Sequence, residues 1–249
     1  MFSQGQRISF GFGAPLTKVG KAMLIGYAVI YVVELLCEHW LAVPVYSWLA
    51  LNPLTSPGFG IWQVITHPLL HAPDAPIGFL INCLVFYFFA GTIEYSLGTR
   101  KFITLYILAA IGGVAAGLPF SALPSFSFLF SGMMPSLLAL IVVFGLMQPE
   151  ASILLFFVLP IKAKYISYGT VIITLLTFLA KANVHGAYHL GGMLFGYLYF
   201  RPPTQLLNVN WWRWKYFELS QKRRRSRFTI IDGERSKRNN NDNDKPTIH

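Results

Sequence analysis

Long apolar runs with almost no charge between them constrain this chain more than any other feature. Residues 22–199 contain five acidic and five basic side chains, and the apolar runs between them have membrane length. A helix needs about 17–25 such residues to cross roughly 30 Å of hydrocarbon. Charged residues make up 12% of the 249-residue chain, against roughly 25% in average globular proteins. The sequence therefore predicts an all-α polytopic membrane protein.

Hydropathy and helix-breaking residues divide this stretch into six predicted spans. Their ranges are 20–37, 79–97, 102–121, 131–148, 165–181 and 184–200. The apolar stretch 153–160 is too short to span, and we expect it at the cytoplasmic interface. The segment 38–78 contains six prolines and several tryptophans. Because tryptophan favours the headgroup level, this segment is expected to be an interfacial loop.

Apart from Lys181 near a span end, basic side chains fall on one side of the predicted spans. They lie before the first span, between the second and third, between the fourth and fifth, and after the sixth. Loops rich in Lys and Arg face the cytoplasm, so both termini are predicted to be cytoplasmic. The start of the chain lacks the pattern of a removable signal peptide. We expect an integral, multi-pass protein of a bacterial inner membrane.

The charge pattern also divides the chain into three expected parts. These are a cytoplasmic segment 1–19, a six-helix membrane domain 20–200 and a basic cytoplasmic tail 201–249. From Arg201 onward there are twelve Lys or Arg residues against five Asp or Glu residues. A basic tail after a span is expected to bind anionic lipid, a simpler partner than nucleic acid. The polar end after Arg235 is expected to be disordered.

Two motifs far apart in the chain carry polar side chains inside apolar surroundings. The first is the block 62–71, Trp-Gln-Val-Ile-Thr-His-Pro-Leu-Leu-His, followed by Asn82 and by Gly91 with Glu94. The second is the segment 186–196, which contains His189, Gly192 and Gly196. Polar groups in membrane spans are costly unless they have a partner or a function. These residues are therefore candidates for a functional site.

In order and spacing, these motifs resemble the rhomboid family of intramembrane serine proteases over roughly residues 60–200. The resemblance implies a six-helix rhomboid-like bundle and serine-type endopeptidase cleavage of transmembrane segments, with no cofactor. By this resemblance His189 corresponds to the catalytic base and Asn82 to an oxyanion-binding residue. The resemblance also implies that Gly192 and Gly196 pack the last span against the fourth. Gly91 and Glu94 match a packing motif of the family.

Two catalytic positions depart from the family pattern. The serine motif falls on residues 132–135, Gly-Met-Met-Pro, which places Met134 at the nucleophile. A thioether has no ionisable proton and cannot form an acyl-enzyme. Gly78 stands where the family has a second histidine, and His71 lies too far along the chain to replace it without remodelling. These departures favour a pseudoprotease that binds single-span or polytopic membrane protein clients.

Two other functions remain open from the sequence. An active protease would use Ser131 with His189, which requires the fourth span to start one turn earlier. Ser136 lies about 200° around a helix from position 134 and faces away. The second is a non-proteolytic role in transport or in perturbing lipid. Transport would depend on the intramembrane acids Glu34 and Glu94, although Glu94 is expected to be structural and paired with Arg100 or with backbone amides.

The spacing of His67 and His71 suits a metal on a helix. Pro68 interrupts that helix, however, and no third ligand lies nearby, so no metal site is expected. Cys37 and Cys83 lie in apolar surroundings and are predicted to be small buried side chains rather than a disulfide.

Overall fold

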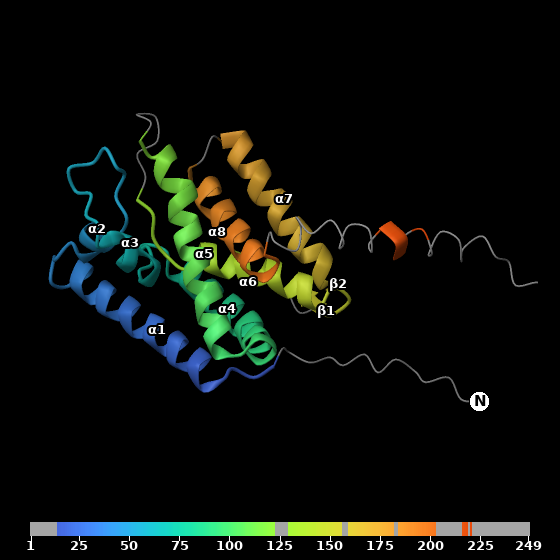
Figure 1. Ribbon diagram of the computed structural model, residues 1–249. Helices are drawn as coiled ribbons and strands as arrows, with labels where there is room; N and C mark the ends of the chain where they lie inside the picture. The colour runs from blue at the N-terminus through green and yellow to red at the C-terminus, as the bar shows by residue number, and fades with distance from the viewer. Residues whose placement is uncertain are drawn as a thin grey trace, which may run out of the picture. The chain divides into compact units, whose positions relative to one another are not determined.

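The computed structural model describes residues 14–122, 129–155, 159–181, 184–202, 216–218 and 220. The chain divides into two units, residues 1–202 and residues 203–249. All the long helices belong to the first unit (Figure 1). Most of the basic tail, including the end that the sequence predicts to be disordered, lies outside the described residues.

Six long helices form the first unit. They are α1 (Lys18–His39), α4 (Pro76–Leu97), α5 (Thr99–Phe120), α6 (Met134–Met147), α7 (Ala163–Lys181) and α8 (Val184–Phe200). Each overlaps one predicted span, so the six-helix, all-α membrane fold is confirmed. Among the described residues, four helices are long and apolar enough to cross a membrane: α1, α4, α5 and α7.

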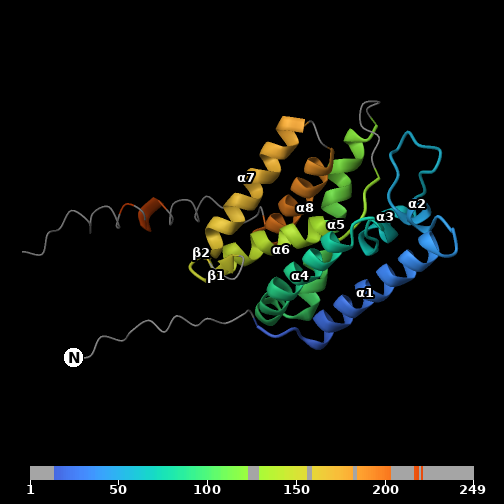
Figure 2. The same ribbon diagram turned by 180° about the vertical axis from the view of Figure 1, so that it is seen from behind.

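Helix α6 is shorter than a membrane is thick. Its 14 residues rise about 21 Å, against roughly 30 Å of hydrocarbon. It packs against α4, α5, α7 and α8, and Figures 1 and 2 show it among these neighbours. Nine of its residues are buried, because protein rather than lipid surrounds most of the helix.

Small residues bring α8 close to its neighbours. It packs most extensively on α5 and then on α6. A Cβ atom added to Gly192 would lie 2.5 Å from Cβ of Pro135, and one added to Gly196 would lie 2.7 Å from Cβ of Ala139. Since lipid provides no hydrophobic drive between helices, this close backbone approach supplies the packing.

The connection between α1 and α4 contains only short elements. These are α2 (Val45–Leu49), α3 (Gln63–Thr66) and the 3₁₀ helix η1 (His67–Leu69). The fully buried Gln63 organises the connection, because its side chain bonds four backbone groups. Its Oε1 accepts from the amides of Asn52 and Gly60, at 3.0 and 3.2 Å. Its Nε2 donates to the carbonyls of Trp48 and Gly58, at 3.1 and 2.9 Å.

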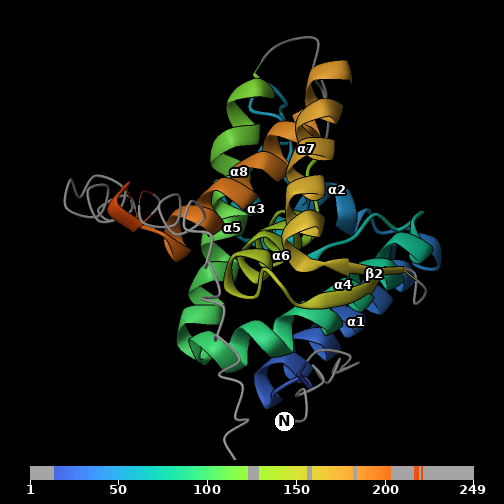
Figure 3. The same cartoon turned by 90° about the vertical axis from the view of Figure 1, so that its right-hand side faces the viewer.

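A β-hairpin joins α6 to α7, where the sequence predicts no strand. Strands β1 (Ser152–Leu155) and β2 (Leu159–Lys162) pair antiparallel beside the start of α7 (Figure 3). Glu150 accepts hydrogen bonds from Lys162 at 2.6 Å and from Lys164 at 2.5 Å. These two ammonium groups lower the pKa of Glu150 to about 2.

Charges of opposite sign collect at the two ends of the helices. One end, here called the basic end, holds Lys18, Lys21, Arg100, Lys101, Lys162 and Lys164 at the starts of α1, α5 and α7. The other, here called the acidic end, holds Glu34 and Glu38 in the last turns of α1 and Asp74 before α4. In Figure 1, the acidic end of α1 is the end next to α2, and its basic end is the opposite one.

Candidate functional site

The segment that precedes α6 is fixed by the connection between α1 and α4. Phe130 pairs with Leu51 in an isolated antiparallel bridge, with two hydrogen bonds of 2.9 Å. Gly132 has a φ of 91°, a left-handed conformation that favours glycine. The amide of Gly132 donates to the carbonyl of His67 at 2.8 Å. This turn delays the start of α6 to Met134, three residues after the predicted start of the span.

Ser131 is the alternative nucleophile, and its hydroxyl has another partner. Ser131 Oγ lies 2.8 Å from the hydroxyl of Tyr46 on α2. The Ser131 side chain is half-buried beside the loop. A nucleophile needs its base within about 2.6–3.2 Å. Tyr46 cannot serve as that base, because burial raises the pKa of its phenol above the usual value.

His189 lies on α8, one turn and a half from the start of the helix. Its side chain is half-buried, and its ring centroid lies 5.8 Å from that of Tyr188. Within the described part of the chain, no hydrogen bond joins His189 to Ser131. The structure therefore shows no hydrogen bond between the alternative nucleophile and the histidine that the resemblance assigns as the base, among the described residues.

Met134 and Ser136 begin α6, and both serve packing. Met134 is half-buried against the main apolar cluster. Ser136 is fully buried, and its hydroxyl donates to the backbone carbonyl of Tyr106 on α5 at 2.7 Å. Ser136 thus links two helices instead of bonding back within its own. Pro135, between them, lies under Gly192 of α8.

Tyr188 precedes His189 and fills the space between α5 and the segment before α6. Its side chain is 1% exposed. Cβ atoms added to Gly113 and Gly117 of α5 would each lie 2.9 Å from it. Its hydroxyl donates to the carbonyl of Gly132 at 3.4 Å. Only glycines on α5 leave room for this ring, so Tyr188 holds the 129–132 segment in place.

His71 lies beside Gly78, to which the resemblance assigns the position of a family histidine. A Cβ atom added to Gly78 would lie 3.4 Å from His71 Nε2. The turn that closes when the amide of Ala75 donates to the carbonyl of Ala72, at 3.0 Å, folds the chain back. The expectation from linear spacing, that His71 lies too far away, is therefore wrong for its position. Asn82 is buried one turn further along α4.

The hydrogen bonds of His71 determine what its ring can offer. Nε2 lies 3.2 Å from the carbonyl of Ala75, so Nε2 carries the proton and donates. Burial lowers the pKa of His71 below its usual range, which keeps the ring neutral. Nδ1 is then an acceptor, 3.8 Å from a Cβ atom added to Gly132. A neutral His71 in this tautomer cannot donate to an oxyanion, which requires N–H or O–H groups.

His67 is fully buried in the same loop. Its Nδ1 donates to the carbonyl of Gln63 at 2.8 Å, and its Nε2 has no partner among the described residues. Burial lowers the pKa of His67 to about 4. Within the described ranges, no group of three potential metal ligands forms around His67 and His71.

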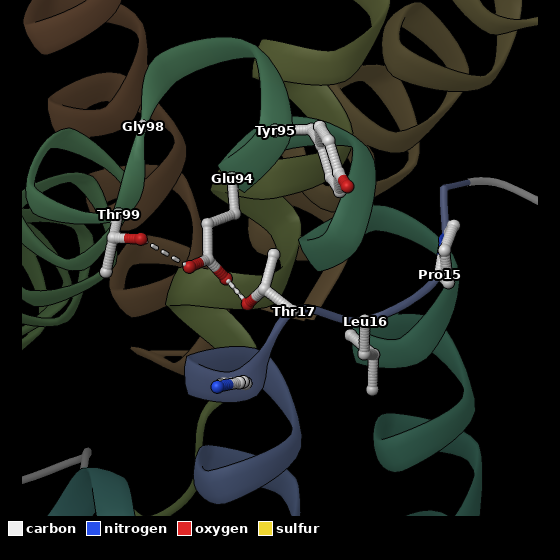
Figure 4. A pocket seen from close by; sticks show the side chains of 8 residues that line it. Pro15, Leu16, Thr17, Glu94, Tyr95, Gly98 and Thr99 are labelled. Carbon is white, nitrogen blue, oxygen red and sulfur yellow. Dashed lines mark hydrogen bonds between the residues drawn. The ribbon is translucent and has the colours of Figure 1, made fainter.

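Glu94 lies at the basic end, beside a pocket of about 350 Å³ (Figure 4). Its Oε1 accepts from the Thr99 hydroxyl at 2.7 Å, and its Oε2 accepts from the Thr17 hydroxyl. The expected pairing with Arg100 or with backbone amides is therefore wrong. The sequence could not reveal Thr17, because it precedes Glu94 by 77 residues. The two threonines make Glu94 a tie between the starts of α1 and α5 and the end of α4.

Gly91 holds the segment before α1 against α4. A Cβ atom added to Gly91 would collide with the carbonyl oxygen of Ala14. The amide of Ala14 donates to the hydroxyl of Thr92 at 3.0 Å. This contact places Thr17 within reach of Glu94.

A search against protein-family models matches residues 58–202 to the rhomboid domain. This match covers more than half of the chain. The protein belongs to the rhomboid family. A search of the curated proteins finds no match. The family and the apolar helices together establish a multi-pass, integral membrane protein of the rhomboid superfamily.

Two tyrosines complete this rhomboid site, and the sequence did not identify their roles. Tyr46 holds Ser131, and Tyr188 holds Gly132. The sequence does mark Tyr188 as unusual, because a large side chain stands where the family often has a small residue before the histidine. It does not mark Tyr46, since an aromatic residue in an interfacial loop is ordinary.

Proposed function

We propose that this rhomboid-family protein is a pseudoprotease that binds membrane protein clients without cleaving them. The observation that carries the proposal is the state of the two candidate nucleophile positions. Met134 stands at the family position and packs into the apolar cluster. The nearby Ser131 bonds to Tyr46, with its oxygen 2.8 Å from the tyrosine hydroxyl.

The oxyanion side of the site supports the same proposal. Gly78 contributes no side chain, and the neutral His71 beside it directs Nε2–H to the carbonyl of Ala75. Asn82 is then the one family donor side chain left at the start of α4. Losing one oxyanion donor typically costs roughly 10²–10³ in rate. A chain that lacks both the nucleophile and a donor would retain little catalysis.

The packing of α7 suggests how a client helix reaches the site. This helix contacts α6 and α8, and it makes no extensive contact with α4 among the described residues. Most side chains of α7 are exposed or half-buried. A transmembrane segment could therefore enter beside α6, between α4 and α7. Because α7 is less buried than the neighbouring helices, it would be displaced more easily than they would.

A paired assay tests the proposal. Purified protein in lipid nanodiscs is incubated with a panel of labelled single-span proteins, and binding is measured by photo-crosslinking while cleavage is measured on gels. We expect binding without cleavage, unchanged in His189→Ala. Cleavage of a client that is lost in both Ser131→Ala and His189→Ala would overturn the pseudoprotease and establish an endopeptidase.

One observation favours that second function, an active serine endopeptidase. The Ser131 hydroxyl, His189 and Asn82 are all present, and one hydrogen bond to Tyr46 occupies the serine. Labelling by a fluorophosphonate probe discriminates between the two functions. Wild-type labelling that disappears in Ser131→Ala would support the endopeptidase, and its absence supports the pseudoprotease.

We further propose that the basic end faces the cytoplasm in a bacterial inner membrane, with both termini on that side. The distribution of Lys and Arg supports this orientation, and the basic tail would then lie on anionic lipid. Single cysteines at exposed Thr55 near the acidic end and at exposed Ser152 near the basic end, each introduced after Cys37 and Cys83 are replaced by alanine, test it. In intact cells, an impermeant maleimide should label the first and spare the second.

A further inference from the structure

The acidic end contains carboxylates without compensating bases. Residues 22–99 include no Lys or Arg and four acidic residues, three of which lie at the acidic end. Among the described residues of the acidic end, the one Lys or Arg is Lys181, where α7 stops. The charge at this end therefore attracts cations and repels anions.

Glu34 is the centre of this cluster, and it is incompletely satisfied. The side chain is 1% exposed. Its Oε2 accepts from the amide of His71 at 3.2 Å. Its Oε1 is buried and has no partner among the described residues. Buried polar atoms nearly always have a partner, and a missing one suggests a ligand, an ion or a water.

A second buried group points to the same place. The Tyr31 hydroxyl, one turn before Glu34, is also buried without a partner among the described residues. Tyr31 packs its ring on His71 and Phe79, and it lies within electrostatic range of Glu34 and Asp74. Two unpartnered oxygens on one face of α1 therefore lie next to the start of α4.

The surrounding groups are mainly acceptors. Glu38 accepts the amide of Tyr46 at 2.7 Å and keeps a second oxygen. The neutral His71 offers Nδ1 as an acceptor, because its Nε2 donates to Ala75. Asp74 is exposed. A metal ion does not fit this cluster, since no three ligating side chains converge within the described residues.

We propose that this cluster is a subsite for a basic side chain, Lys or Arg, that flanks the transmembrane segment of a client. The inference rests on the proposed client-binding function and names what the client must carry. Arg and Lys bring several donors and no acceptor, which complements Glu34 and Tyr31. Their long apolar stems let the charged head reach the interface from a membrane-embedded helix.

Designed helices test the subsite directly. Three single-span peptides share one leucine-rich core. At the terminus expected next to the acidic end, one carries two Arg residues, one two Gln residues and one two Glu residues. Full-length protein is placed in nanodiscs of zwitterionic lipid, and affinity is measured by fluorescence anisotropy. Hydrogen bonds to charged groups are strong enough that we expect the Arg peptide to bind about tenfold more tightly than the Gln peptide.

Variants then assign the preference to the cluster. Glu34→Gln should remove the preference for Arg and leave the affinity for the Gln peptide unchanged. Glu150→Gln, at the basic end, is the matched control and should keep the preference. Because Glu34 also holds the His71 amide, the exposed Asp74→Asn provides a second variant that cannot disturb the core, and it should weaken the preference about threefold.

The outcomes separate this inference from the proposed function. If all three peptides bind equally, or if the preference persists in both Glu34→Gln and Asp74→Asn, the subsite is overturned and client binding stands. If no peptide binds the wild-type protein, the client-binding function falls, and the subsite falls with it. An internal water at Glu34 would give the first result.

Discussion

Two buried carboxylates at opposite ends of the helices differ in how completely they are satisfied. Glu94 at the basic end is 2% exposed, and both of its oxygens accept hydrogen bonds from threonines. Glu34 at the acidic end is 1% exposed, yet one of its oxygens has no partner in the described structure. Burial is the same, so the difference lies in the partners.

That difference separates a structural acid from a binding acid. Thr17 and Thr99 come from two different helices, so Glu94 fixes the positions of α1 and α5 around α4. Glu34 makes one bond to a loop amide and retains capacity for a ligand. Intramembrane acids are costly, and an unsatisfied one indicates a role beyond packing.

The largest expected effect is the loss of stability in Glu94→Ala. This change leaves the hydroxyls of the half-buried Thr17 and the exposed Thr99 without their charged acceptor, and it removes a tie between three helices. We expect the free energy of unfolding to fall by about 3 kcal/mol, measured by chemical denaturation in detergent. Glu34→Ala, which removes one hydrogen bond, should cost about 1–2 kcal/mol.

The glutamine variants at both positions test whether Glu94 and Glu34 really differ in their structural role. Glu94→Gln keeps an acceptor oxygen and should recover part of the loss, whereas Glu34→Gln should be nearly neutral. Equal losses for the two alanine variants would mean that Glu34 is as structural as Glu94, and the distinction would fail.

The next effect concerns the pH dependence of stability at the acidic end. The pKa of His67 is about 4 in the fold against a usual 6.5, because the ring is buried. Between these values the unfolded chain binds more protons, so stability falls as the pH drops from 6.5 towards 4 and is restored as the pH rises. The contribution of His67 is at most about 3 kcal/mol.

Unfolding measured at both pH values in wild type and His67→Gln checks this effect. The variant should be less stable at neutral pH, and it should lose most of the slope over this range. A slope that survives the substitution would assign the pH dependence to another group.

A smaller loss of stability is expected from Gly91→Ala, which disturbs the packing of the basic end without changing Glu94 itself. The added methyl would collide with the carbonyl of Ala14 and displace the segment that carries Thr17. Overpacking of this kind typically costs about 1–3 kcal/mol. Gly26→Ala is the control, since nothing lies within 4 Å of a Cβ atom there. A neutral Gly91→Ala would show that this segment does not need its close contact.

The helices of this fold could be predicted because each membrane span is one continuous apolar stretch of the sequence. Each apolar run of sufficient length became a helix. The start of α6 was missed by three residues, since the φ of 91° at Gly132 depends on the contact with His67. The hairpin 152–162 was also missed. Its apolar run is too short to distinguish the repeat of a helix from that of a strand.

The site could be predicted only in part, because its contacts join distant segments. Composition located Glu94 inside a span, but its partner Thr17 caps the start of a different helix, α1. Linear spacing placed His71 too far from the start of α4, since the turn at Ala72–Ala75 was not recognised. The bond between Tyr46 and Ser131 spans 85 residues, and no local pattern encodes it.

The smallest expected effect concerns the hydroxyl pair of Tyr46 and Ser131 at the acidic end. Removing either hydroxyl loses one half-buried hydrogen bond, and such bonds average about 0.6 kcal/mol in membrane proteins. Tyr46→Phe and Ser131→Ala should therefore each cost about 0.5–1 kcal/mol, and the double variant should cost no more than either alone. This shared loss is measurable by a double-mutant cycle in detergent. If the costs add fully, the two hydroxyls do not interact.

Tyr46→Phe should also leave fluorophosphonate labelling absent, because freeing Ser131 supplies neither the base contact nor the missing oxyanion donor. Labelling that appears only in Tyr46→Phe would instead identify Tyr46 as the residue that restrains a working serine.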